Sequence, residues 1–150
     1  MPKSKIQVGI TGEYLALAKL TERGYVAALT QKNTENIDVL CANPDNNRAV
    51  CLQIKTTANK SDGWVISRKA ERLDSPNLFY IFINIYDPNN PSYHIINARD
   101  LAKQTAEGHK QWLNTPNKTG GKHNDNDIRT FFDRDGKYRD NWKIIEDYLK

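Results

Sequence analysis

Three polar side chains interrupt two short apolar segments that lie close together in the chain. Asp38 stands within Asn36–Cys41, and Gln53 and Lys55 stand within Val50–Thr57. Carboxylate and amide oxygens are ligands that hard divalent cations prefer, and an ammonium group stabilises charge that develops on a phosphate. These residue types therefore indicate metal-dependent phosphate chemistry, provided that the fold brings them together.

The two segments are predicted to form a β-hairpin, because the residues 43–47 between them are dense in turn formers. Side chains alternate between the two faces of a strand, and one register places both apolar sets on the same face. These sets are Ile37, Val39 and Cys41 on the first strand and Val50, Leu52 and Ile54 on the second. Since a slip of one residue would turn a whole strand over, we expect Asp38 on the same face as Gln53 and Lys55.

A second carboxylate belongs to the predicted N-terminal helix, residues 4–24. Ser4 and Gln7 fit a capping box, and Gly24 is a typical left-handed stop. The apolar stripe at helical spacing consists of Ile6, Ile10, Leu17 and Leu20, and Glu13 stands within it. A carboxylate at such a position is expected to face a positive charge, which Lys55 or a cation near Asp38 would supply.

This combination resembles the PD-(D/E)XK nuclease-like superfamily. The matching residues are Glu13 on the helix, Asp38 on the first hairpin strand, and Gln53-Ile54-Lys55 on the second. The resemblance extends to about residue 85. Ile37 replaces the proline of the family motif and Gln53 replaces its second acid, as in a known variant that includes some homing endonucleases.

The resemblance implies a metal-dependent endonuclease that hydrolyses the phosphodiester bonds of DNA with Mg²⁺ or Mn²⁺. Asp38, the Gln53 amide oxygen, the Ile54 backbone carbonyl and Glu13 would hold the cation. Lys55 would orient or help to deprotonate the attacking water and offset charge in the transition state. The neutral Gln53 should weaken cation binding, because it removes one negative ligand.

The fold class we predict is α/β, with a restriction-endonuclease-like core in one domain of 150 residues. A mixed central sheet of five to six strands is flanked by helices, and the N-terminal helix packs on the sheet. The predicted strands are 25–31, 36–41, 50–57, 64–67, 78–86 and 93–96, and further helices are predicted at 98–113 and 140–150.

The formal net charge of +4 permits a polyanionic partner. We expect that partner to be nucleic acid, DNA in particular. The predicted backbone contacts are Thr56, Thr57, Lys60, Lys118 and Lys122. The two last lysines belong to residues 114–126, a polar segment predicted to be a flexible surface loop.

No apolar run reaches transmembrane length and no secretory leader precedes the helix, so we expect a cytoplasmic protein without membrane contact. Cys41 and Cys51 should lie on opposite faces of the hairpin, which predicts two reduced thiols rather than a disulfide.

Three other interpretations fit the same residues. Asp38 and Lys55 could form a cross-strand salt bridge on a solvated face, which is worth roughly 0–1 kcal/mol. Gln53 also suits a nucleic-acid-binding domain of the same fold that has lost catalysis. The third is a structural or protein-interaction module in which Glu13, Asp38 and Lys55 form an internal ionic network. On the nuclease interpretation, cutting both strands of a duplex with one site per chain would suit a homodimer.

Overall fold

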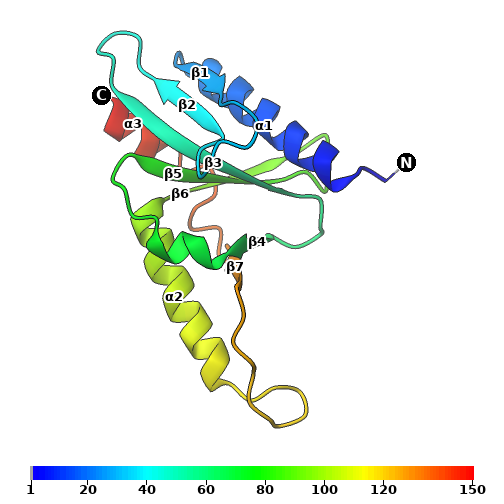
Figure 1. The fold of residues 1–150 in the computed structure, drawn as a ribbon. Helices are drawn as coiled ribbons and strands as arrows, with labels where there is room; N and C mark the ends of the chain where they lie inside the picture. The colour runs from blue at the N-terminus through cyan, green and yellow to red at the C-terminus, as the bar shows by residue number, and fades with distance from the viewer. Residues whose placement is uncertain (1) are drawn as a thin grey trace.

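The computed structural model describes residues 2–150, which form an α/β fold around a mixed five-stranded sheet (Figure 1). The strand order is β1-β2-β3-β5-β6. The strands are β1 (Val26–Leu29), β2 (Val39–Ala42), β3 (Ala49–Thr57), β5 (Leu78–Asn84) and β6 (Ser92–Asn97). β3 and β5 run parallel, and the other neighbours are antiparallel. The predicted fold class is confirmed.

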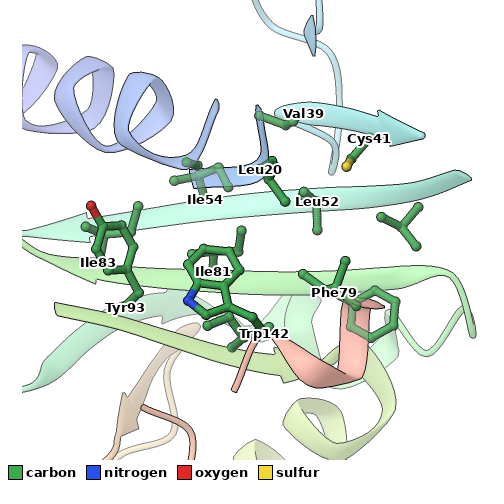
Figure 2. Packing of buried hydrophobic residues seen from close by; sticks show 14 of the residues in the cluster. Leu20, Val39, Cys41, Leu52, Ile54, Phe79, Ile81, Ile83, Tyr93 and Trp142 are labelled. Carbon is green, nitrogen blue, oxygen red and sulfur yellow. The ribbon is translucent and has the colours of Figure 1, made fainter. Parts of the chain in front are cut away.

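Helices α1 (Lys5–Thr21) and α3 (Lys143–Leu149) cover one face of this sheet. Their side chains share a buried cluster with the inward residues of the strands, and Figure 2 shows this cluster from close by. The predicted capping box of Ser4 and Gln7 is present, and Gly24 has the left-handed φ of 88° that ends the helix turn. Trp142, Ile145 and Leu149 are buried on α3 as the sequence pattern predicts.

The buried stripe of α1 differs from the predicted one. Gly12, Ala16 and Leu20 face the sheet, whereas Ile6 is 75% exposed and Ile10 is 46% exposed. A Cβ atom on Gly12 would lie only 1.7 Å from Thr56 Oγ1 on β3. Small residues thus let the helix backbone approach the strand closely, and this approach, rather than the largest apolar side chains, sets the helix rotation. The predicted stripe through Ile6 and Ile10 is therefore wrong.

The opposite face carries α2 (Ala98–Asn114), the 3₁₀ helix η1 (Arg68–Arg72) and a second, two-stranded sheet. This sheet pairs β4 (Gly63–Ser67) with β7 (Ile128–Phe132). Its inward side chains, among them Trp64 and Phe131, pack on Tyr80 and Phe82 of β5. The strand predicted at 64–67 therefore belongs to a separate β-ribbon, and its partner β7 was not predicted.

The segment between α2 and β7 has defined local structure. Asn117 Oδ1 accepts hydrogen bonds from the backbone N–H groups of Thr119 and Gly121. The ring of His123 stacks on Trp112 with a centroid distance of 4.1 Å, which joins the segment to α2. The predicted flexibility of residues 114–126 stays a prediction.

Both cysteines are free, and they lie on opposite faces of the hairpin as predicted. Cys41 belongs to the cluster beneath α1, and Cys51 packs against the cluster that includes the ribbon. Spanning a bilayer would need a longer and more apolar helix than any that residues 2–150 form.

Candidate active site

The candidate site lies where β2 and β3 part. β2 pairs with β3 only as far as Val39 and Leu52, whereas β3 continues beside β5 to Thr57. The chain reaches β2 through a turn in which Asn33 and Asn36 both have positive φ, at 66° and 63°. Asparagine adopts this backbone conformation more readily than other residues with a side chain. Because of this turn, β2 begins only at Val39, and no strand within residues 2–150 lies beside the second half of β3 on the β2 side. We call this open edge of β3, next to Asp38, the fork.

Asp38 occupies this fork. Its backbone N–H donates to the Leu52 carbonyl at 2.8 Å, and its Oδ2 accepts from the Ile54 N–H at 2.8 Å. The carboxylate thus takes the place of a backbone acceptor that a longer β2 would have supplied. Val39, Leu52 and Ile54 lie in one cluster, which confirms the predicted apolar register. The Asp38 carboxylate lies at the edge of β3, where it accepts from the Ile54 N–H.

The Ile54 carbonyl is directed to the same edge as this carboxylate. Successive strand residues hydrogen-bond to opposite edges, and each directs its N–H and C=O to one edge. On β3 the Thr57 carbonyl accepts from Ile85 on the β5 side, while the Leu52 carbonyl and the Ile54 N–H bond on the β2 side. A cation held by Asp38 would therefore find the Ile54 carbonyl next to it.

Glu13 reaches the same region from α1. Its side chain is half-buried, and its pKa is raised from the usual 4.5, first by burial and then by the negative charge of Asp38. The two carboxylates are thus close enough to repel each other. The contact of Gly12 with Thr56 fixes the helix at this distance from β3. A cation between the two groups would remove the repulsion.

Gln53 and Lys55 extend from β3 on the face opposite α1. Gln53 is buried and lies beside Tyr80 in the β3–β5 register. The pKa of Tyr80 is raised to about 12, first by burial and then by the charge of Asp38. The charge of Asp38 therefore raises pKa values on both sides of the sheet, that of Glu13 on the α1 side and that of Tyr80 on the other.

Among residues 2–150, no ion pair within 4.0 Å joins any two of Glu13, Asp38 and Lys55. The cross-strand salt bridge and the internal ionic network are both absent from this arrangement.

Lys55 lines a groove of about 550 Å³ that lies between the start of α1, the end of β3, and β4. The groove is lined by Lys3, Lys5, Lys55, Thr56, Thr57, Asn59 and four apolar residues with Gly63, and no carboxylate lines it. We call it the lysine groove. Thr56 and Thr57 were predicted to contact a nucleic acid, and both line it, but the Thr56 hydroxyl is buried against Gly12 of α1 and does not face the groove. Lys3 and Lys5 were missed, although they flank the helix cap.

Lys60 is exposed on the connection from β3 to β4 and does not line the groove. Lys118 and Lys122 lie on the segment beyond the far end of α2, away from the five-stranded sheet (Figure 1). The structure therefore does not bring these two lysines to Asp38 and Lys55.

The donor set fits a hard divalent cation. Carboxylate, amide and carbonyl oxygens are the ligands that Mg²⁺ and Mn²⁺ take. No group of three or more His, Cys, Asp and Glu residues within 2–150 is placed to hold a metal ion. A cation at the fork would therefore need Gln53 or the Ile54 carbonyl beside the two acids.

Glu13→Gln is expected to raise the melting temperature at pH 7 and to leave it unchanged at pH 4. A raised folded-state pKa means that the folded protein releases the Glu13 proton less readily than the unfolded chain. Stability is therefore lost as pH rises above 4.5 through the folded pKa, and the amide removes this loss. Thermal unfolding at both pH values measures it, with the exposed Glu107→Gln as control. A lower melting temperature at pH 7 would show instead that Glu13 has a favourable partner.

The α/β arrangement of sheet and helices is shared with a solved structure. No protein-family model matches the sequence, and no curated protein sequence matches it either. The fold is similar to the structure of a bacterial homing endonuclease, I-Ssp6803I, with a TM-score of 0.59 and 10% identity. The match covers 96% of this chain and 92% of that one. At this identity, the similarity establishes the fold.

Proposed function

We propose that this protein is a Mg²⁺- or Mn²⁺-dependent DNA endonuclease with a PD-(D/E)XK type of site. The observation that carries the proposal is the fork, where the Asp38 carboxylate accepts from the Ile54 N–H and its charge raises the pKa of Glu13, and where Lys55 follows Ile54 on β3. The similar fold of a bacterial homing endonuclease supports it, because the match covers 96% of this chain. The neutral Gln53 is the point at which the site departs from the usual acid.

Each residue has a physical role in phosphodiester hydrolysis. The Ile54 N–H fixes Oδ2 of Asp38 and leaves Oδ1 for a cation. Gln53 and the Ile54 carbonyl add neutral oxygen ligands, and Glu13 adds a second charge or accepts a proton from the attacking water. The bound metal would supply a Lewis acid for the scissile phosphate. The Lys55 ammonium stabilises the charge that grows on the phosphate oxygens in the transition state.

The lysine groove supports DNA as the substrate. Three ammonium groups face one groove that no carboxylate lines, and this suits a run of phosphates. Lys60 lies next along the chain and Lys118 and Lys122 are further away, so we assign them at most to outer phosphates of a long duplex. Because each chain has one such site, cutting both strands calls for a homodimer.

Asp38→Asn is expected to abolish metal-dependent cleavage without unfolding the protein. The amide oxygen of asparagine can still accept from the Ile54 N–H, but the negative charge that attracts a cation is lost. We expect nicking of supercoiled plasmid in Mg²⁺ or Mn²⁺ to fall by at least about 100-fold and Mn²⁺ affinity in calorimetry to fall about 10- to 100-fold. Asp45→Asn is the matched control, because Asp45 lies in the exposed hairpin turn.

The outcomes separate the proposal from its rivals. Salt-dependent DNA binding without cleavage or metal binding by the wild type would favour the non-catalytic DNA-binding domain. Absence of any DNA binding would overturn both readings.

A further inference from the structure

The outer face of the β4–β7 ribbon carries no charged side chain of either strand, and its β7 residues line a groove of about 450 Å³ with His109 and Trp112 of α2. Val65 pairs with Thr130 and Ser67 pairs with Ile128, so these side chains share the face that points away from the core. Val65 is 71% exposed and Ile128 is 59% exposed. Phe132, at the end of β7, is exposed on the same face. We call this set the ribbon face. Such exposure is high for large apolar side chains on neighbouring strands, which indicates a binding surface.

The ribbon is held rigidly from behind. Trp64 Nε1 donates to the Ile83 carbonyl at 3.0 Å, and Asp133 and the buried His94 form a hydrogen bond of 2.6 Å just after β7. Arg129, on the inner face, pairs with Glu71 of η1. These contacts hold the backbone of the ribbon in place behind the ribbon face. A binding surface that recognises a partner by its shape needs such support.

Positive side chains border the ribbon face at both ends. At one end the lysine groove continues onto it, because Gly63 and Val65 line the groove together with Lys55. At the other end Ser67 lines a groove of about 310 Å³ with Arg68, Lys69, Arg72 and Asp127. Arg68 pairs with Asp127 and Lys69 pairs with the exposed Glu35, so the net positive charge of this border comes from Arg72. An uncharged strip between two cationic borders complements duplex DNA, in which base edges lie between two phosphate backbones.

We propose that the ribbon face lies in the major groove of duplex DNA and contacts base edges there, while the two basic borders contact the flanking phosphates. This inference rests on the proposed function and adds that the enzyme selects its sequence. The major groove is about 12 Å wide and admits a two-stranded ribbon. Val65 and Ile128 have no hydrogen-bonding side chain, so the contact open to them is with the thymine C5 methyl group.

The test is selection from a random duplex library in EDTA, where binding is measured without cleavage. We expect the wild type to enrich a sequence that contains A·T pairs, and Val65→Ala with Thr130→Ala to lose the preference at two or three of these pairs. Both residues are exposed, so folding should be unaffected. Lys3→Ala with Lys5→Ala should weaken binding to all sequences alike and reduce the slope of log K against log salt by about 2. Val26→Ala, which is exposed on β1, is the control.

Deoxyuridine substitution sharpens the test, because uracil lacks the methyl group of thymine. In the selected sequence it should weaken wild-type binding by about fourfold for each methyl contact, and it should weaken binding of the Val65→Ala variant by one such factor less, because that variant keeps the Ile128 contact. Wild-type binding without sequence preference, or a preference that the ribbon variants retain, would overturn the inference while leaving the endonuclease proposal intact. Self-association that Val65→Ala abolishes would assign the ribbon face to a second copy of the chain. Failure to bind any DNA would overturn the proposed function itself.

Discussion

Lys55→Ala is expected to abolish DNA cleavage while leaving the fold and most DNA binding intact. The Lys55 ammonium belongs to no ion pair in the described chain, so removing it leaves no partner charge unpaired. One contact that stabilises a transition-state charge is typically worth about 10²- to 10³-fold in kcat. We expect a loss of at least this size in plasmid nicking with Mg²⁺ or Mn²⁺, measured on the same samples as the melting temperature.

Two further variants serve as controls for the Lys55→Ala result. Lys143→Ala removes an exposed lysine that pairs with Asp147 on α3, and it should cleave like the wild type. Lys55→Arg keeps the charge but changes its shape and position, so it should bind DNA like the wild type and recover cleavage only in part. A purely structural role would be the better account under two conditions. The wild type would show no cleavage, and Lys55→Ala and Asp38→Asn would both lower the melting temperature strongly.

The sequence predicted those parts of the site that depend on strand alternation. Val39, Leu52 and Ile54 lie on one face and Gln53 and Lys55 on the other, because alternation is strict once a strand forms. Alternation could not predict the position of the Asp38 carboxylate. That depends on where β2 stops pairing, and the side chain then takes a backbone acceptor's place.

The sequence pattern did not predict the rotation of α1, for a different reason. Hydropathy gives most weight to large side chains such as Ile6 and Ile10, but a helix that packs closely on a strand turns its small residues inward. A glycine four residues before an alanine and eight before Leu20 was the available signal. The pairing of β4 with β7 joins residues more than sixty positions apart, and no local pattern in the chain specifies such a contact.

Gly12→Ala is expected to lower both stability and cleavage, in contrast to the same change at Gly9. A Cβ at position 12 would lie 1.7 Å from Thr56 Oγ1 and 2.8 Å from Thr56 Cβ, so the helix must move away from β3. Overpacking of this kind costs about 1–3 kcal/mol. Alanine at position 9 meets no atom within 4 Å and should stabilise the helix by about 0.5–1 kcal/mol. Denaturant unfolding of the two variants gives the comparison.

A second substitution, at Thr56, tests whether the contact between position 12 and Thr56 causes the loss of stability in Gly12→Ala. Its Oγ1 is buried without a hydrogen-bond partner, so Thr56→Ala alone should cost little. In the Gly12→Ala background it removes the nearest clashing atom and should recover part of the lost stability, which a double-mutant cycle measures as a coupling between the two positions. Cleavage should recover with it, because the approach of α1 to β3 also sets the distance between Glu13 and Asp38. If Gly12→Ala stabilised the protein as Gly9→Ala does, α1 would not lie against Thr56, and Glu13 would lose its place at the fork.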